Sequence, residues 1–203
     1  MFVTLEGIEG SGKSTLLGGM LERMRPLGFE VLATREPGGT PVGDAIREVV
    51  LRPGLHVEPL TEALLMNASR AALVRDVVRP ALEAGKIVLC DRYYDSSLAY
   101  QGYGRGLDLT MLRGICAAAT GGLDPDLTLI LDIPVEISRQ RLESRPGKSD
   151  RLDNETIAFY ARARQGFLDL AVREPRMRVL DATRSVEELT DEAMALLSRA
   201  LAT

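Results

Sequence analysis

The residues best suited to chemistry lie close to the start of the chain, in the segment Gly7-Ile8-Glu9-Gly10-Ser11-Gly12-Lys13-Ser14. The pattern is G-x-x-x-x-G-K-[ST], directly after an apolar run and before a stretch with helical spacing, which is the context a phosphate-binding loop requires. The glycines let successive N–H groups face one centre, and the helix start adds partial positive charge. We expect Lys13 to reach the β- and γ-phosphates of a nucleotide and the Ser14 hydroxyl to bind Mg²⁺.

The loop by itself leaves three classes of protein open: a kinase, a guanine-nucleotide switch and an ATP-driven machine. The sequence contains no Asn-Lys-x-Asp, the tetrapeptide with which switch proteins usually read guanine. A P-loop domain of 203 residues also has little room for the additional modules of most ATPase motors. Both observations favour the kinase.

Charged side chains at two predicted strand ends form a second candidate group. Arg35 follows the run Val31–Thr34, and Asp91 and Arg92 close the next run. In an open parallel sheet, ligands bind beyond the carboxyl ends of the strands, so we expect these side chains beside the phosphate loop. The arginines would bind an anion, and Asp91 holds the place of the carboxylate that organises Mg²⁺. A solvated arginine and an ordinary turn or N-cap aspartate are the alternatives.

The balance between arginine and histidine bears on the kind of acceptor. His56 is the single histidine, and we interpret it as structural or exposed. A phosphate acceptor needs no strong base, because its second pKa lies at about 6 and the attacking oxygen is ionised at neutral pH. It does need positive charge to bring two anions together. Several arginines around one cleft therefore favour transfer from phosphate to phosphate.

A sheet is expected to position these side chains. Five short apolar runs predict its strands: Phe2–Leu5, Val31–Thr34, Ile87–Asp91, Leu127–Ile133 and Arg178–Asp181. Most are continuous rather than alternating, as in parallel strands buried on both faces. Segments with helical spacing separate them, which predicts an α/β fold with right-handed crossovers. We expect a single domain over residues 1–203.

Two stretches depart from this regular pattern. Pro80 falls inside the helical stretch Thr61–Ala84 and should kink that helix or end it early. The segment Glu143–Asp153 is polar and charged, with Pro146 and Gly147 at its centre. We expect it to form an exposed, mobile loop between two helices.

Composition narrows the partners and the compartment. The formal net charge of -4 argues against a nucleic-acid backbone as the partner. Cys90 and Cys116 are too few for a disulfide framework, which favours a reducing compartment. No run of about 18 apolar residues and no secretion signal is present, so we expect no membrane association and a cytoplasmic location.

The ordered motifs closely resemble those of bacterial thymidylate kinases, over nearly the whole chain. The matching segments are Leu5-Glu6-Gly7 leading into the loop, Thr34-Arg35-Glu36-Pro37-Gly38-Gly39, Asp91-Arg92-Tyr93 with Ser96-Ser97-Leu98-Ala99-Tyr100-Gln101, and Asp150-Arg151-Leu152-Asp153. The resemblance implies a three-layer P-loop NTPase fold, in which helices flank a five-stranded parallel sheet and a short mobile lid spans about residues 143–153. It also implies phosphorylation of dTMP to dTDP by ATP with Mg²⁺, in a homodimer.

The same resemblance implies the site residues. ATP would be bound by Gly7, Glu9, Gly10, Ser11, Gly12, Lys13, Ser14 and Thr15, and the metal by Ser14 and Asp91. The substrate dTMP would be bound by Glu9, Arg35, Pro37, Arg47, Met66, Arg70, Arg92, Ser97, Tyr100 and Gln101. The implied catalytic set is Lys13, Asp91, Arg92, Arg145 and Arg151.

Roles within the dTMP set follow from the family. The arginines expected at the acceptor phosphate are Arg35 and Arg92, with Arg47 as a candidate third. Arg70 matches the arginine that hydrogen-bonds the thymine carbonyl.

The remaining matches concern the base and the sugar. Ser97 and Gln101 stand where the family reads the ring N–H of thymine. Glu9 would face the sugar 3′-hydroxyl or the metal. Tyr100 would lie beneath the deoxyribose, where an added 2′-hydroxyl would be crowded.

Met66 departs from the family, which usually has a phenylalanine there that stacks on thymine. A spacing of four keeps Met66 and Arg70 on one helical face, and a thioether packs against a ring less rigidly than an aromatic does. Weaker thymine binding or a more tolerant pocket would follow, whereas plain core is the alternative for Met66. This residue keeps a kinase for another nucleoside monophosphate, or for a nucleoside, open.

A run of cations precedes and enters the segment at 143–153: Arg139, Arg141, Arg145, Lys148 and Arg151. By itself such a run is typical of a solvated face. The resemblance implies instead that lid arginines close over ATP and exclude water. We select Arg145 and Arg151 for that role, with Lys148 as an auxiliary candidate, and expect the loop near Arg184 to line the adenine pocket.

Two further alternatives stay open. A P-loop regulatory module without turnover would leave Asp91 and the arginines without a common purpose. The apolar helix positions Leu73, Val77 and Ala81 fit either a dimer interface or the core of one chain.

Overall fold

The computed structural model describes residues 1–144 and 150–202. At its centre is a sheet of five strands, β1 (Phe2–Glu6), β2 (Val31–Arg35), β3 (Ile87–Asp91), β4 (Leu127–Asp132) and β5 (Met177–Asp181). The strand order is β2-β3-β1-β4-β5, and each neighbouring pair runs parallel. The predicted α/β class and all five predicted strands are confirmed.

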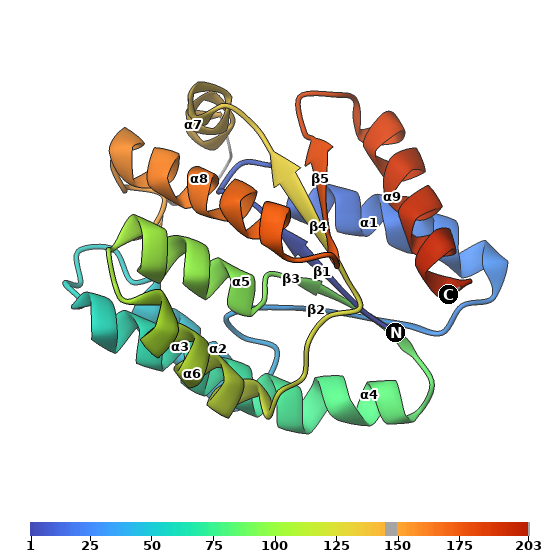
Figure 1. Cartoon of the computed structure of the whole chain (residues 1–203), viewed down its shortest axis with the longest axis horizontal. Helices are drawn as coiled ribbons and strands as arrows, with labels where there is room; N and C mark the ends of the chain where they lie inside the picture. The colour runs from blue at the N-terminus through green and yellow to red at the C-terminus, as the bar shows by residue number, and fades with distance from the viewer. Residues whose placement is uncertain (145–149, 203) are drawn as a thin grey trace.

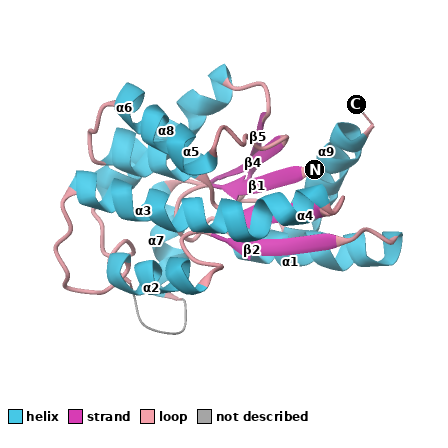
Figure 2. Ribbon diagram, turned by 90° about the horizontal axis from the view of Figure 1, so that it is seen from below, coloured by secondary structure: helices cyan, strands magenta, loops and turns pink. Residues whose placement is uncertain are grey.

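Helices cover both faces of the sheet, giving three layers (Figure 1). They are α1 (Lys13–Met24), α2 (Pro41–Val50), α3 (Pro59–Leu73), α4 (Arg79–Glu83), α5 (Tyr94–Ser97), α6 (Leu109–Thr120), α7 (Val135–Glu143), α8 (Ile157–Arg173) and α9 (Val186–Leu201). A 3₁₀ turn, η1 (Arg25–Leu27), and two π-helical segments, η2 (Val74–Val78) and η3 (Leu98–Gly104), complete the elements. Figure 2 shows α1 behind the sheet and α3 and α4 in front of it.

Strand β3 shows why the apolar runs are continuous. Val88 and Cys90 pack in one cluster with Leu73 of α3. Ile87 and Leu89 belong to the larger core. Because helices cover both faces, each of these four strand residues is buried. The parallel arrangement also brings the carboxyl ends of the strands to one edge of the sheet.

The α-helix ends ahead of Pro80, which was one of the two expected effects of this proline. Helix α3 ends at Leu73, the π-helical segment η2 follows, and Pro80 lies in the first turn of α4. In a continuous α-helix, the proline ring would clash with the carbonyl group of Asp76. The wider π turn relieves that clash, so the disturbance precedes the proline and the chain stays helical.

The predicted exposed loop at 143–153 needs a correction at its carboxyl end. Residues 145–149 lie outside the described residues. Leu152 and Asp153 are buried. The Tyr160 hydroxyl donates to the Leu152 carbonyl oxygen at 2.8 Å, and the Arg139 guanidinium donates to the Asp153 carbonyl oxygen at 3.0 Å. These contacts with α7 and α8 hold the segment against the body of the protein.

Of the two alternatives for Leu73, Val77 and Ala81, the structure favours the core of the chain. Leu73 and Ala81 are buried and pack with Phe2 and Val88 in the core of the chain itself, and Val77 packs against the same cluster. Among the described residues, no helix has both the length and the apolar character to cross a membrane.

Candidate active site

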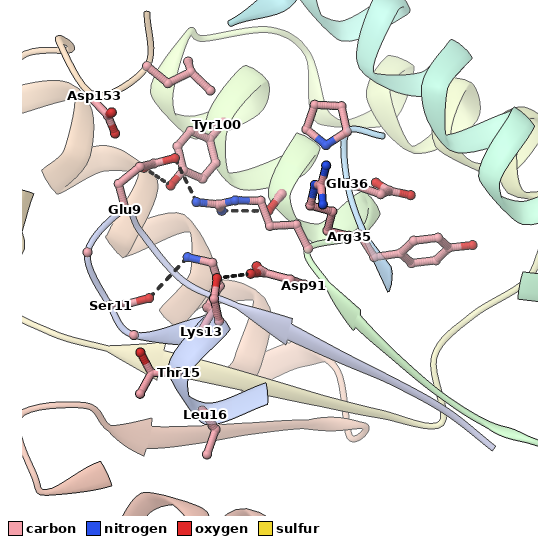
Figure 3. A pocket seen from close by; sticks show the side chains of 18 of the residues that line it. Glu9, Ser11, Lys13, Thr15, Leu16, Arg35, Glu36, Asp91, Tyr100 and Asp153 are labelled. Carbon is pink, nitrogen blue, oxygen red and sulfur yellow. Dashed lines mark hydrogen bonds and ion pairs between the residues drawn. The ribbon is translucent and has the colours of Figure 1, made fainter. Parts of the chain in front are cut away.

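A cavity of about 700 Å³ opens at the carboxyl edge of the sheet (Figure 3). It brings together most of the predicted site residues: Glu9, Gly10, Ser11, Gly12, Lys13, Ser14, Thr15, Arg35, Pro37, Arg47, Met66, Arg70, Asp91, Arg92, Ser97, Tyr100 and Gln101. Gly7 and Arg151 are not among its lining residues, and Arg145 lies outside the described part of the chain.

The phosphate loop depends on glycine at three positions. Gly7, Gly10 and Gly12 have φ values of 136°, 70° and 95°, a region that side chains rarely allow. A Cβ at Gly7 would also approach the Leu131 carbonyl oxygen to 2.5 Å. Gly7 therefore determines the path of the loop and does not itself line the cavity. Gly12 is the N-cap residue of α1 and supplies no side-chain cap, which suits the N-terminus of the helix to an anion.

Lys13 folds back onto the loop in this structure. Its ammonium group donates to the carbonyl oxygens of Gly7 and Ile8, both at 3.0 Å, and to Ser11 Oγ at 3.3 Å. Burial, followed by the nearby Arg92 guanidinium, lowers the pKa of Lys13 to about 8. Phosphate oxygens would replace these neutral acceptors with negatively charged ones, to which an ammonium group binds more strongly.

Ser14 and Asp91 form a pair of hard oxygen donors. The Ser14 hydroxyl donates to Asp91 Oδ2 at 2.7 Å, and both residues line the cavity. No cluster of three or more metal-ligating side chains occurs among residues 1–144 and 150–202. Mg²⁺ in kinases is bound by one or two protein oxygens together with substrate phosphates and water, so this sparse donor set fits it.

Arg92 lies between the phosphate loop and the rest of the cavity. Its Nη1 donates to the Gly7 carbonyl oxygen at 2.9 Å, and its Nη2 donates to Glu9 Oε1 at 2.8 Å. The guanidinium carbon lies 5.1 Å from the centre of the Tyr100 ring, a distance typical of a cation–π contact. Arg92 also has φ +73°, which is uncommon for a residue with a side chain and is often found at functional sites.

Glu9 and Tyr100 meet on the same side of the cavity (Figure 3). The Tyr100 hydroxyl donates to Glu9 Oε2 at 2.5 Å, so the two carboxylate oxygens of Glu9 contact Tyr100 and Arg92 respectively. Burial raises the pKa of Tyr100 well above its ordinary value. Tyr100 therefore stays a neutral hydrogen-bond donor.

Two more arginines supply positive charge from β2 and α2. Arg35 is largely exposed and lies 3.8 Å from Asp44. Arg47 Nη1 donates to the Pro37 carbonyl oxygen at 2.9 Å. Burial and then the neighbouring Arg35 guanidinium lower the pKa of Arg47. The two cations thus lie close enough to repel one another, which an anion between them would relieve.

Arg70 also lines the cavity, and its guanidinium is already fully engaged by protein groups. Its Nε and Nη2 contact Glu36 Oε2 at 2.8 and 2.7 Å, and Nη2 donates to the Tyr93 carbonyl oxygen. Its Nη1 donates to Asn67 Oδ1 and to Ser97 Oγ. A base carbonyl at Arg70 would therefore share or replace one of these partners.

Met66 lines the cavity and is only partly buried. The interpretation of Met66 as plain core is therefore wrong, and its thioether is available to a ligand.

Two further glutamates, Glu36 and Glu6, support the side chains that line the cavity, and neither of them was selected from the sequence. The other oxygen of Glu36, Oε1, is buried without a hydrogen-bond partner among the described atoms, and burial raises the pKa of Glu36 to about 7 despite Arg70. Glu6 accepts from the Tyr93 backbone N–H at 2.7 Å and from Ser96 Oγ at 2.5 Å. It thereby fixes the turn that carries Arg92. Both glutamates stood within the motifs quoted above, which was the signal available.

The cations between Arg139 and Arg151 do not all reach the cavity. Arg141 lines the cavity and donates to the carbonyl oxygens of Gly10 at 3.3 Å and Ala182 at 3.0 Å. Arg151 points elsewhere: it donates to the Val50 carbonyl oxygen at 2.8 Å and pairs with Glu62. Arg145 and Lys148 lie outside the described residues. Arg184 lines the cavity, as expected of the loop after β5.

The fold and this cavity define a P-loop nucleotide kinase. The chain belongs to the thymidylate kinase family, because the family model described as thymidylate kinase matches residues 5–193. It is 57% identical to a thymidylate kinase of Deinococcus radiodurans, covering 98% of this chain and 96% of that one. A thymidylate kinase of Thermomicrobium roseum is 49% identical over 98% of this chain and 95% of its own. The crystal structure of a thymidylate kinase from Ehrlichia chaffeensis superposes with a TM-score of 0.79 at 31% identity, covering 97% of this chain and 98% of that one.

Proposed function

We propose that this enzyme transfers the γ-phosphoryl group of ATP to dTMP, giving dTDP and ADP. The position of Arg92 carries this proposal. Its guanidinium contacts the phosphate loop through Gly7 and Glu9, in the same cavity as Arg35 and Arg47. One cavity therefore holds a phosphate loop and a separate cluster of arginines, which suits a donor and an acceptor that are both anions.

The donor phosphates would lie on the N-terminus of α1, within reach of Lys13. Ser14 and Asp91 would hold Mg²⁺, which supplies positive charge shared between the donor phosphates. Helix α1 and strand β3 fix these two residues against each other through their hydrogen bond. Arg141 and Arg184 would contribute to the adenosine end, since both line the same cavity near the loop after β5.

The acceptor phosphate would be bound by Arg35, Arg47 and Arg92. Its attacking oxygen is ionised near neutral pH, so these residues need to hold and orient it without removing a proton. The repulsion between Arg35 and Arg47 would be relieved by the phosphate, which adds to its binding. Transfer is then in line, from the loop toward the arginines.

The nucleoside would extend toward Met66, Arg70, Ser97 and Gln101. Met66 would pack against the base, and Arg70, already braced by Glu36, would donate to a base carbonyl. Tyr100, which the Glu9 carboxylate holds in place, would pack against the sugar and leave no room for a 2′-hydroxyl. This arrangement favours a deoxynucleotide with a keto pyrimidine base.

Arg145 and Arg151 remain our candidates for the cations that neutralise the transferring group. Arg151 would have to leave Glu62 and the Val50 carbonyl oxygen in order to reach the cavity. Such a movement would couple closure of the segment near residues 143–153 to catalysis.

We also propose a homodimer that acts in the cytoplasm. Helix α3 packs against α6, and together they expose Leu60, Leu64 and Met111, which are 44%, 51% and 38% accessible. A second copy would cover this apolar face. The cysteines, Cys90 and Cys116, are both free, as is usual in a reducing compartment.

An ADP-release assay with Mg·ATP across dTMP, dUMP, UMP, CMP and thymidine tests the proposed reaction. We expect dTMP to give the highest kcat/KM. Turnover of another monophosphate but not of dTMP would identify a different nucleotide kinase, whereas turnover of thymidine alone would indicate a nucleoside kinase. Binding of ATP without turnover of any acceptor would favour a regulatory module.

A further inference from the structure

Glu62 of α3 is a buried carboxylate that gathers three side chains. It is 0% exposed and is not among the residues that line the cavity. Its Oε1 accepts from Gln101 Nε2 at 2.7 Å and from Arg105 Nε at 3.3 Å. Its Oε2 accepts from Arg105 Nη2 at 3.1 Å and from Arg151 Nη2. Only one of these partners, Gln101, lines the cavity.

Glu62 carries a negative charge at neutral pH. Burial acts to raise its pKa, but the hydrogen bonds from Arg105, Gln101 and Arg151 and the positive charge of Arg105 together outweigh burial and leave the pKa of Glu62 below its ordinary value. An ionised carboxylate can only accept hydrogen bonds. The amide of Gln101 must therefore direct its NH₂ end toward Glu62, which leaves its carbonyl oxygen for a ligand.

We propose that Glu62 is a positioning residue that sets base selectivity by fixing the orientation of the Gln101 amide. Gln101 then presents an acceptor, which matches thymine and uracil because both carry a hydrogen on ring N3. Cytosine carries a lone pair on N3, which would face the Gln101 oxygen and repel it. Rotating the amide to suit cytosine would turn the same oxygen against the Glu62 carboxylate. The inference rests on the proposed function and adds a residue outside the cavity to it.

The substitution Glu62→Gln tests this idea with almost no change in shape. The introduced amide places its NH₂ end where it meets fewer guanidinium groups. Oε2 contacts both Arg105 and Arg151, whereas Oε1 contacts Arg105 and Gln101, so the NH₂ end takes the Oε1 position. Gln101 must then rotate to accept from it and present its own NH₂ group to the cavity.

The measured quantity is the ratio of kcat/KM for dTMP to that for 5-methyl-dCMP, two substrates that differ only at position 4 and N3. We expect Glu62→Gln to lower this ratio roughly 10- to 100-fold, as expected for one mispaired hydrogen bond in a buried site. The KM for ATP should stay unchanged. Any loss of kcat from loosening Arg151 affects both substrates and cancels in the ratio.

Two controls separate orientation from general damage. Arg105→Lys weakens the support of Glu62 but leaves its carboxylate facing Gln101, so the ratio should stay at the wild-type value. In a Gln101→Leu background no amide remains to be oriented, so adding Glu62→Gln should leave the ratio where Gln101→Leu alone places it.

If folded Glu62→Gln keeps the wild-type ratio, the inference is wrong. It is also wrong if Glu62→Gln changes the ratio by the same factor in the wild-type and the Gln101→Leu backgrounds. Circular dichroism reports folding. If Glu62→Gln does not fold, Gln101→Leu decides the matter, since an unchanged ratio there shows that Gln101 does not select the base. Failure of the wild-type enzyme to phosphorylate dTMP would instead refute the proposed function.

Discussion

The Ser14 hydroxyl donates a 2.7 Å hydrogen bond to Asp91, across 77 residues of sequence. The first turn of α1 and the end of β3 thus hold their oxygens together before any ligand arrives. Among the described residues, the proposed Mg²⁺ would have to displace this one hydrogen bond in order to reach both side chains. The two proposed ligands are therefore held together in advance of binding, which lowers the cost of ordering them.

Asp91→Asn should impair metal-dependent turnover more than it impairs folding. The amide keeps the shape and an acceptor for Ser14 but removes the negative charge, so we expect kcat to fall by about 100-fold or more. The Mg²⁺ concentration for half-maximal rate should rise. Steady-state assays over a Mg²⁺ titration measure both quantities. Asp124→Asn, which alters a surface hydrogen bond to Tyr94, is the matched control, and identical Mg²⁺ curves for the two variants would contradict the assignment.

The rate should depend on pH through Lys13. Its pKa in the free enzyme is about 8, so its positive charge is present below that pH and lost above it. We expect kcat/KM for ATP to fall by roughly tenfold per pH unit on the alkaline side. Bound phosphates favour the charged form, so the profile of kcat should turn down at a higher pH. In Lys13→Arg, this fall of kcat/KM at alkaline pH should disappear. If kcat/KM still falls at the same pH in that variant, the titrating group is not Lys13.

Arg151 and Arg141 should differ in the step they affect. If Arg151 reaches the transferring group, Arg151→Ala lowers kcat by about 100-fold or more with little change in the KM for dTMP. Arg141 already contacts the phosphate loop, so Arg141→Ala should raise the KM for ATP about tenfold. Arg178→Ala, at an exposed arginine that donates to the carbonyl oxygens of Pro175 and Met177, serves as the control. An unchanged kcat in Arg151→Ala would remove Arg151 from the catalytic set.

Met66→Phe should strengthen the binding of dTMP. Met66 lines the cavity, and an aromatic ring stacks on a base better than a thioether does. We expect the KM for dTMP to fall roughly 2- to 10-fold, with the KM for ATP unchanged. A KM for dTMP that does not fall would mean that the base does not pack against this position.

Leu64→Glu should convert the proposed dimer into a monomer. Leu64 is 51% exposed on α3, and a buried unpaired carboxylate at an apolar interface is strongly unfavourable. Sedimentation equilibrium measures the mass of the species in solution. Leu27→Glu, at a leucine that is 65% exposed in η1, should leave the dimer intact. A monomeric wild-type protein, or a dimeric Leu64→Glu variant, would exclude this interface.

The sequence predicted the features that depend on local pattern. Strand β3 was visible because both faces of the sheet are covered there, which makes Ile87, Val88, Leu89 and Cys90 one continuous apolar run. The phosphate loop was visible because only glycine tolerates the backbone at Gly7.

The remaining features depend on tertiary contacts. Glu62 fixes the orientation of the Arg151 side chain from 89 positions away in the sequence, and no local pattern predicts that pairing. Arg141 could not be separated from the other cations of its run, because only the packing of α7 shows that it reaches the cavity. The π-helical segment ahead of Pro80 is a different case, because the proline indicated a disturbance of the helix but not its form.

The central place of β1 has a consequence for how the protein is made. This strand precedes the other four strands in the sequence, yet it lies between β3 and β4, with Leu5 paired to Asp91 on one side and to Leu129 on the other. A nascent chain therefore carries the glycine-rich loop long before the residues that give it shape. Such distant pairing slows folding, and affinity for nucleotide should arise late and all at once. ATP would then stabilise only finished molecules and would not assist the partly synthesised chain.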